Sequence, residues 1–282
     1  MSITDKAMVV TLSVSCWTAR KQDKKVTAEV EKSHGAHDAG RYNKLLVEKA
    51  KLDPLTSHAG KIRQKHYEMT LPWLDNGGRL LPSRLYFNYQ KAMVPLQEQF
   101  EGLINDFISE YDTKLVADAR SRLGTMYDPT DYPPSSVLRR KFGIDIDVAP
   151  VPNATDFRVA VGDEERQKIQ DQITARMEER QRKAMNNAWE RVRDVVGNVV
   201  TRLDVFKPVI HESLMDNAQT LAGLLPGLNI LEDPKLDEVA RRMRDELNWS
   251  ANNLRKSLHA RRAAVASARE ILTLVPDITE DA

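Results

Sequence analysis

The fold is decided by residues 163–206, which read DEERQKIQDQITARMEERQRKAMNNAWERVRDVVGNVVTRLDVF. Apolar residues recur in this stretch at steps of three and four, the spacing that places side chains on one face of an α-helix. Asp163, Glu164 and Glu165 stand at its start, where the helix dipole favours acidic side chains. We therefore predict one long amphipathic helix, roughly 65 Å in length at about 1.5 Å per residue.

The apolar stripe of this helix must be covered by another element, because isolated helices are weakly stable in water. The middle of the stretch, residues 176–183, is almost entirely charged. This pattern favours a projecting arm that pairs with a helix expected at residues 83–110 or, as a coiled coil, with another subunit. The residues that we expect at an oligomer interface are Ile169, Ile173, Met177, Val192, Val199 and Leu203.

Helical periodicity also appears on both sides of the long helix. Before it, the pattern predicts helices at residues 18–33 (capped by Thr18), 55–69, 83–110 and 112–123. After it, shorter helices are predicted at residues 209–225, 233–247 and 248–274. The expected fold class is mainly α with a small antiparallel β element, that is α+β.

The β element is predicted from alternation of apolar and polar residues. Val10, Leu12, Val14 and Cys16 alternate with hydroxyl-bearing residues, the pattern of a strand with one buried face. Two further runs, at 144–148 and 157–161, predict a hairpin within 143–161. Two strands alone are marginal in water, so pairing with the N-terminal strand would complete a small sheet. Residues 41–48 are compatible with another short strand, and residues 71–78 are expected to form a loop.

These elements suggest consecutive regions along the chain. They are a mixed α+β region (1–162), the long helical arm (163–206), short C-terminal helices (207–275) and a loose acidic tail (276–282).

Composition excludes several classes of protein. The 282 residues carry 42 basic and 41 acidic side chains, so any nucleic-acid binding must depend on local basic patches. The single cysteine, Cys16, excludes an internal disulfide framework and is typical of a reducing cytosol. No apolar run reaches the ~18–20 residues that span a bilayer, and the N-terminus lacks the pattern of a secretory signal. We expect a cytoplasmic protein without a membrane partner.

Catalytic chemistry is not indicated by any motif. His34, His37 and Asp38 are close in sequence, and Asp145 and Asp147 share a strand face, but neither group has the ligand number and spacing of a metal site. Whether either group binds an ion stays open. Cys16 is expected to be a structural thiol. We therefore expect no enzyme activity, no cofactor and no metal.

Two basic clusters with a nearby tryptophan are better functional indications. Phosphates require clustered cations, and unpaired bases stack on flat aromatic surfaces. No acidic residue lies between Arg255 and Arg269. Solvated helix faces and core aromatics are the alternative explanation of both clusters. The candidate nucleic-acid-binding residues are Trp17, Arg20, Lys21, Lys24, Lys25, Trp249, Arg255, Lys256, Arg261, Arg262 and Arg269.

Several segments together are similar to one known family. The segments are residues 4–8, 17–21, 40–46, 71–73 and 151–158, which read TDKAM, WTARK, GRYNKLL, LPW and VPNATDFR. Their order resembles a family of uncharacterised proteins of tailed bacteriophages and prophages, often encoded among DNA-metabolism genes. The likeness covers about the first two-thirds of the chain. It implies a viral protein in the host cytoplasm, and the family has no assigned activity that would give any residue a role.

Two functions are compatible with these observations. The first is a non-enzymatic phage accessory protein of DNA metabolism, a homo-oligomer that binds single-stranded nucleic acid through its basic faces. The alternative is a coiled-coil assembly or adaptor protein that binds another phage or host protein, or its own copies, with no role for nucleic acid.

Overall fold

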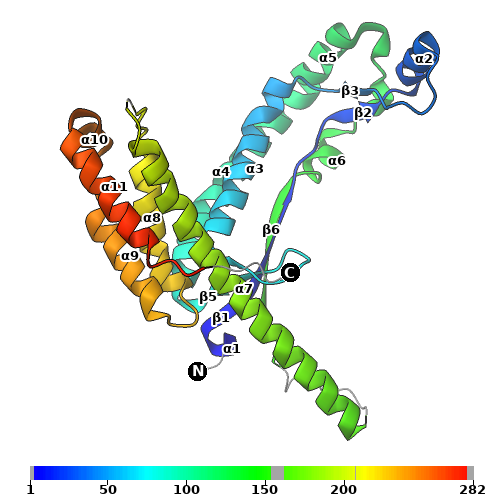
Figure 1. Ribbon diagram of the computed structural model, residues 1–282. Helices are drawn as coiled ribbons and strands as arrows, with labels where there is room; N and C mark the ends of the chain where they lie inside the picture. The colour runs from blue at the N-terminus through cyan, green and yellow to red at the C-terminus, as the bar shows by residue number, and fades with distance from the viewer. Residues whose placement is uncertain (1–2, 154–161, 207, 278–282) are drawn as a thin grey trace. The chain divides into compact units, whose positions relative to one another are not determined.

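The computed structural model describes residues 3–153, 162–206 and 208–277, and it is mainly helical with two small β-sheets (Figure 1). The first half of the chain forms α1 (Ile3–Lys6), β1 (Ala7–Ser15), β2 (Arg20–Gln22), α2 (Lys24–His34), β3 (Asn43–Leu45), α3 (Lys49–Met69), β4 (Leu71–Pro72), β5 (Arg79–Pro82), α4 (Tyr86–Glu110), α5 (Val116–Leu123), α6 (Ser135–Arg139) and β6 (Gly143–Pro150). The second half forms α7 (Asp163–Leu203), α8 (Ser213–Leu228), α9 (Pro234–Glu246), α10 (Ala251–Lys256) and α11 (Leu258–Leu272). The expected α+β class is confirmed.

The chain divides into two compact units. Unit 1 comprises Met1–Thr11, Tyr67–Tyr89 and Asp147–Ala282, and unit 2 comprises Leu12–His66 and Gln90–Ile146. Each unit therefore gathers segments that are distant in the sequence, whereas the sequence suggested consecutive regions. The two units are described separately below.

The larger sheet has four strands in the order β4-β5-β1-β6. Strand β5 runs antiparallel to β1, with Ala7 opposite Pro82 and Val10 opposite Arg79. The predicted N-terminal strand is confirmed and begins three residues earlier than Val10, at Ala7. Strand β6 confirms the run predicted at 144–148 and lies beside β1, as expected. Its predicted hairpin partner, residues 157–161, lies outside the described residues.

Of the loop expected at residues 71–78, residues 73–78 form a loop with a tight turn, whereas Leu71 and Pro72 form β4, which pairs with β5. The turn closes through a hydrogen bond from the Leu74 N–H to the Gly78 carbonyl, 2.8 Å long. Gly77 has a φ of +94°, which only glycine adopts readily. A Cβ on Gly78 would lie 2.9 Å from Leu74 Cδ1, so a side chain at 78 would not fit unless Leu74 moved. The glycine pair thus permits both the turn and its close packing.

The long helix α7 is confirmed, although it ends at Leu203 and not at Phe206, whose side chain is 93% exposed. Its C-terminal half packs against α8 and α11, and these helices lie side by side with α9 in unit 1 (Figure 1). Ala188, Val192, Val196 and Val199 are completely buried there. This bundle is the main core of unit 1.

The expected oligomer interface on α7 is divided by this packing. Val192, Val199 and Leu203 lie in the interior of unit 1, where a second copy cannot reach them. The neighbours that cover them belong to the same chain, because α8 and α11 supply the apolar faces that the stripe requires. In the N-terminal half, no residue of 162–176 is buried, and Ile169 and Ile173 are half-buried. Met177 is again buried, at 8% exposure.

The core of unit 2 includes the facing sides of α3 and α4, where His58 of α3 stacks on Phe100 of α4. Leu55, Ala59 and Ile62 of α3 are buried, as are Phe100 and Ile104 of α4. Helix α4 continues through Pro95, where the sequence favoured a kink or a restart. A π-helical turn (Tyr111–Leu115) then joins α4 directly to α5, so Asp112 does not cap a separate helix, as the sequence had suggested.

The two largest differences between predicted and observed helix starts concern α2 and α3. Residues 18–33 do not form one helix, because Ala19 adopts a φ of +50° and β2 follows it. Helix α2 begins at Lys24, and Asp23 is its N-cap, with the carboxylate accepting from the N–H groups of Lys25 and Val26 at 3.1 Å. Helix α3 begins at Lys49, six residues before Leu55, with Pro54 inside it. A proline near the first turns removes one backbone hydrogen bond without ending the helix.

Candidate nucleic-acid interface

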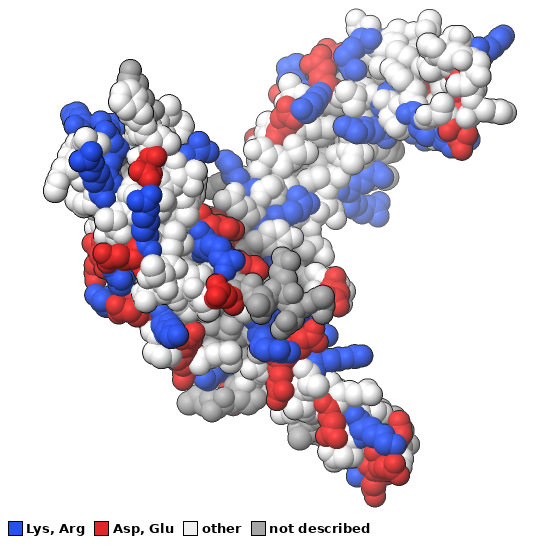
Figure 2. Space-filling model, viewed as in Figure 1, with Lys and Arg blue, Asp and Glu red and all other residues white. Residues whose placement is uncertain are grey.

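The C-terminal basic cluster lies on α10 and along α11, and Figure 2 shows Lys and Arg gathered over α10. Three of its five cations are engaged within unit 1. Arg255 donates to the Ile210 carbonyl at 2.6 and 2.9 Å, and Arg261 donates to the Leu254 carbonyl at 2.8 Å. Arg269 pairs with Asp204 at 2.6 Å. Hydrogen bonding within the fold therefore accounts for these three arginines.

Arg255 and Arg269 are exposed but paired within the fold, so Lys256 and Arg262 are the members of this cluster that have no polar partner among the described residues. Both are exposed, and neither has an ion pair with a described carboxylate. Two cations form a smaller patch than the five that the sequence suggested.

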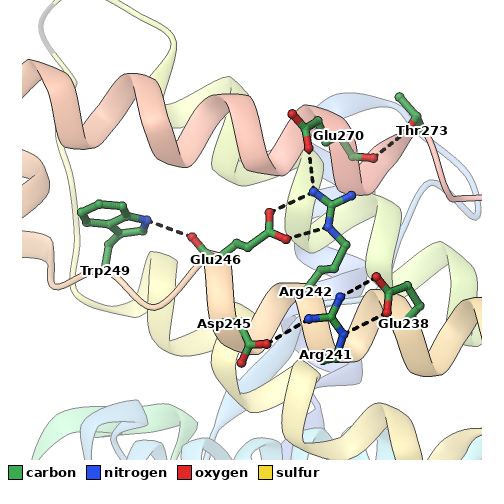
Figure 3. Close-up of polar contacts among 8 residues, drawn as sticks. All are labelled: Glu238, Arg241, Arg242, Asp245, Glu246, Trp249, Glu270 and Thr273. Carbon is green, nitrogen blue, oxygen red and sulfur yellow. Dashed lines mark hydrogen bonds and ion pairs between the residues drawn. The ribbon is translucent and has the colours of Figure 1, made fainter.

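Trp249 is held by the polar network between α9 and α11. Its indole Nε1–H donates to the Glu246 carbonyl at 2.9 Å, and the side chain is half-buried (Figure 3). The guanidinium of Arg242 binds both Glu246 and Glu270, at 2.7 Å each, and these contacts raise the pKa of Arg242. The network joins two helices of unit 1, and the bond from Trp249 to the backbone at the end of α9 gives this side chain a structural role beside any contact with a base.

The N-terminal cluster keeps all four of its cations exposed. Arg20 and Lys21 lie on β2, which pairs with β3, and Lys24 and Lys25 lie in the first turn of α2. Lys21 is 3.8 Å from Asp131, while Arg20, Lys24 and Lys25 have no ion pair with a carboxylate of the described chain. Between residues 12 and 66, twelve basic residues stand against six acidic ones. Three cations of this cluster, Arg20, Lys24 and Lys25, have no ion pair with a described carboxylate, against two exposed cations of that kind, Lys256 and Arg262, in the C-terminal cluster.

The position of Lys24 and Lys25 is electrostatically unfavourable for the helix. The N-terminus of a helix carries a partial positive charge, which favours acidic side chains in the first turn. Helix α2 has no acidic residue there; Asp23 is its N-cap, and Asp128 interacts electrostatically with Lys25 without forming an ion pair. An anionic ligand at this end of α2 would therefore be attracted by both the lysines and the helix dipole.

Lys44 lies beneath this surface and was not identified as important from the sequence. Its Nζ is 2.8 Å from Asp131, 3.7 Å from Asp23 and 2.6 Å from the Met126 carbonyl, and the residue is only 6% exposed. Burial alone would lower the pKa of Lys44, but Asp131 and Asp23 outweigh burial and the pKa is raised. Because Lys44 lies on β3 and bonds to Met126 and Asp131, it fixes β3 to the segment at 126–131.

The pH dependence of stability is expected to report this network. The pKa of Asp23 is lowered from its ordinary 3.8, chiefly by the Val26 N–H, so its stabilising contribution is present above pH 3.8 and is lost as the pH falls through the lowered value. The raised pKa of Lys44 gives a contribution present below 10.5 and lost as the pH rises through the folded value. Thermal unfolding followed by circular dichroism should show a plateau between these limits.

The variant Lys44→Met tests whether Lys44 causes the loss of stability at alkaline pH. Burial raises the pKa of Tyr132 to about 12, so ionisation of this tyrosine also destabilises the folded protein at high pH. Lys44→Met should unfold at a lower temperature than the wild type, and this difference in unfolding temperature should shrink above pH 10.5, where Lys44 of the wild type loses its charge. A constant difference up to pH 12 would contradict this assignment.

Trp17 packs inside unit 2 with other aromatic rings. Its ring centroid is 6.4 Å from that of Phe107 and 5.9 Å from that of Tyr111, both in edge-on geometry. Such contacts are typical of a core aromatic cluster. Trp17 is half-buried and is therefore a poor surface for stacking a base, although it was a candidate from the sequence.

Tyr42 is an exposed aromatic residue near the N-terminal cations, with 40% of its surface accessible. Its backbone N–H donates to Thr27 Oγ1 at 3.1 Å, and its carbonyl accepts from the Asp23 N–H at 2.9 Å. These bonds attach the loop that ends in Tyr42 to the first turns of α2. The sequence placed Tyr42 only in an uncertain strand, because this attachment joins residues fifteen or more apart.

A cavity of about 350 Å³ lies between α2 and this loop. It is lined by Thr27, Val30, Glu31, His34, Ala36, Ala39, Gly40, Arg41 and Tyr42. A second cavity, of about 360 Å³, shares Thr27, Glu31 and Arg41 with it and extends to Gln22 and Lys24. The N-terminal basic cluster therefore adjoins two hollows in the surface of unit 2.

Metal-binding groups do not gather in the part of the chain that the structure describes. No three or more His, Cys, Asp or Glu side chains are placed there to hold an ion. His34 lines the first cavity and His37 the second, with Asp38 bonded to Arg41 at 2.8 Å. Asp145 and Asp147 are exposed on β6.

Among the described helices, none is both long enough and apolar enough to cross a bilayer.

Comparison with known proteins adds no relative to this picture. No family model, curated protein or solved structure matches the chain. The two basic surfaces and the adjoining cavities are therefore the features from which a function can be inferred.

Proposed function

We propose that the protein binds single-stranded nucleic acid, without catalysing a reaction, through the exposed cations of β2 and α2. In line with the resemblance noted in the sequence, we place it as an oligomeric accessory protein of DNA metabolism in a tailed bacteriophage, acting in the host cytoplasm. The observation that carries the proposal is the pair Lys24 and Lys25, two exposed lysines at the positive end of a helix, neither of which forms an ion pair with a carboxylate of the described residues.

A single strand fits this surface better than a long duplex. The overall charge is close to neutral, at +1, so the basic surface is local and matches a few phosphates. Single strands also offer unstacked bases, which bind beside cations on aromatic and apolar surfaces. The exposed ring of Tyr42 and the adjoining cavities provide such a surface next to the lysines.

The salt dependence of binding tests the proposal. The double variant Lys24→Ala/Lys25→Ala should bind a labelled oligothymidine more weakly, because two phosphate contacts are lost. The slope of log K against log salt should become shallower by about 0.7 for each lysine removed. Fluorescence anisotropy at several salt concentrations measures both quantities.

A matched variant on α3 provides the control for this experiment. Lys49→Ala/Lys61→Ala removes the same charge from two exposed lysines of unit 2 and should leave the slope unchanged. Lys256→Ala/Arg262→Ala asks in the same assay whether the α10–α11 surface contributes. Absence of binding at low salt, or an equal loss in the α3 variant, would contradict the proposal.

The second candidate function, a coiled-coil assembly or adaptor protein, is favoured by the N-terminal half of α7. This half has no buried residue before Met177, and Ile169 and Ile173 lie one turn apart on one face. Its first turn is acidic, and Arg180, Arg182 and Lys183 lie roughly 25 Å further along the helix at about 1.5 Å per residue, although Lys183 also pairs with Glu179 within the helix. An antiparallel second copy would oppose these charges. Ile169 and Ile173, and not Val192 or Leu203, are then the residues that a second copy would contact.

A further inference from the structure

The cavity between α2 and the loop at 36–42 has the size and lining of a small-molecule site. Its volume of about 350 Å³ lies at the lower end of the ~300–1,000 Å³ range of such sites. Val30, Ala36 and Ala39 provide apolar walls, and His34 and Tyr42 provide rings. A flat heterocyclic ring is the kind of group that such walls favour.

Two apolar groups of this cavity are left in contact with water. Val30 is 49% exposed and Tyr42 is 40% exposed. A ring that entered the cavity would cover both and remove apolar surface from water, which is favourable in proportion to the area covered. The walls are held in place without a ligand, because the bonds of Tyr42 to Thr27 and Asp23 fix the loop to α2.

Polar groups of both signs stand among these apolar walls. The carboxylate of Glu31 accepts hydrogen bonds, and the guanidinium of Arg41 donates them. Asp38 binds Arg41 at 2.8 Å and, together with Glu31, raises its pKa, so Arg41 is charged. An unpaired nucleobase presents both hydrogen-bond donors and acceptors on its edge, and these edges are accessible in single-stranded nucleic acid.

The cations beside the cavity fit the phosphates of the same strand. Lys24 lines the adjoining hollow of about 360 Å³, which shares Thr27, Glu31 and Arg41 with the first cavity. An apolar side chain of a protein partner would also fit the walls, but it would not explain why an unpaired lysine lies next to them. Charge complementarity therefore favours a nucleotide strand over a peptide.

We infer that this cavity accepts one unpaired base of a bound strand, while Lys24 and Lys25 contact the phosphates next to it. The inference rests on the proposed function, because the strand is held first by the cations. It adds a base-binding site whose wall is formed by Tyr42.

An abasic strand separates base binding from phosphate binding. Tyr42→Ala in the full chain should weaken binding of oligothymidine about tenfold, the size of one base–aromatic contact. The same variant should bind an abasic strand of equal length as the wild type does. Tyr42→Phe, which keeps the ring, should restore binding of oligothymidine. Fluorescence anisotropy gives the affinities, and circular dichroism verifies folding.

A second variant reaches the same site without removing the ring. Ala39→Trp fills the cavity and should weaken oligothymidine binding to a similar extent, again without an effect on the abasic strand. Phe87→Ala removes an 81% exposed aromatic side chain of α4 and serves as the control that should change neither affinity.

The outcomes distinguish this inference from the proposed function. If Tyr42→Ala and Ala39→Trp weaken both strands equally, or neither, the cavity does not hold a base, while binding through Lys24 and Lys25 stands. If neither strand binds the wild type at low salt, the proposed function and this inference both fail. If the cavity binds a protein partner instead, Tyr42→Ala and Ala39→Trp should bind oligothymidine as the wild type does. This result would also overturn the inference.

Discussion

Val192→Asp is expected to unfold unit 1, whereas Ile173→Asp on the same helix should leave it folded. Val192 is completely buried where α7 packs against α8 and α11, so an aspartate there would place an unpaired charge in an apolar core. Removing a charge from water without a partner is among the most destabilising single changes. We expect a loss above ~4 kcal/mol, against a total stability of about 5–15 kcal/mol for a typical domain.

The measurement is thermal unfolding followed by circular dichroism, with light scattering on the same samples. Val192→Asp should lose much of the helical signal or its cooperative transition. Ile173→Asp is the matched control, because it introduces the same charge at a half-buried position in the N-terminal half of α7. A Val192→Asp protein that unfolds at the wild-type temperature would show that this packing is wrong.

The same pair of variants separates folding from assembly. A change at Val192 that lowers the mass in solution reports unfolding, since this residue lies inside unit 1. A lower mass for Ile173→Asp with an unchanged unfolding midpoint would instead place a second copy on the exposed half of α7. Mass by light scattering, with and without oligonucleotide, then distinguishes the assembly function from nucleic-acid binding.

Local patterns were sufficient to predict the main elements of the fold. The three-and-four spacing from Ile169 to Leu203 gave the long helix, and its start after Gly162 agrees with the acidic first turn. Alternation around Val10 gave β1, and the run at 144–148 gave β6. These signals succeed because each depends on side chains within a few residues of one another.

The element that covers the α7 stripe could not be predicted in this way. Any helix with an apolar face is a possible partner, and the sequence favoured the helix at 83–110 or a second subunit. The structure uses α8 and α11, where small buried residues such as Ala264 and Ala268 lie on the inner face of α11. Periodicity identifies a face that must be buried but does not identify its partner.

The basic clusters show a similar limit. The acid-free spacing of Arg255, Arg261 and Arg269 suggested free cations, yet the acceptors of the first two are mainly backbone carbonyls, which every sequence contains. Lys44 was missed because its partners Asp23 and Asp131 are far apart in sequence. Spacing locates charges along the chain, but only the fold shows which of them remain accessible.

Arg191→Met is expected to destabilise unit 1 by about 3 kcal/mol, because Arg191 satisfies the last carbonyls of α3. Its guanidinium donates to the carbonyls of Tyr67, Glu68 and Thr70 at 3.0, 2.9 and 2.6 Å, and to Asn187 Oδ1 at 3.0 Å. The last carbonyls of a helix have no partner within the helix, and a cation there also interacts favourably with the dipole.

No glycine follows α3 to cap it, since Thr70 leads directly into β4. Burial lowers the pKa of Arg191 to about 10, and nearby Arg79 adds to this effect, so the guanidinium is still charged at pH 7. Arg79 supports the same helix end by donating to the Thr70 carbonyl at 3.1 Å and lying 4.7 Å from the centroid of the Tyr67 ring. Two arginines thus replace the usual backbone cap.

Methionine keeps the length of the side chain but donates no hydrogen bond, so three carbonyls would lose Arg191 as a partner. The midpoint of thermal unfolding should fall by roughly 10 °C for a loss of this size. The unfolding midpoint of Arg191→Lys should lie between those of the wild type and Arg191→Met, because one ammonium group cannot reproduce the planar guanidinium that reaches several carbonyls. Arg202→Met removes an exposed arginine of the same helix and should change the midpoint little. Equal midpoints for Arg191→Met and Arg202→Met would mean that α3 ends without help from Arg191.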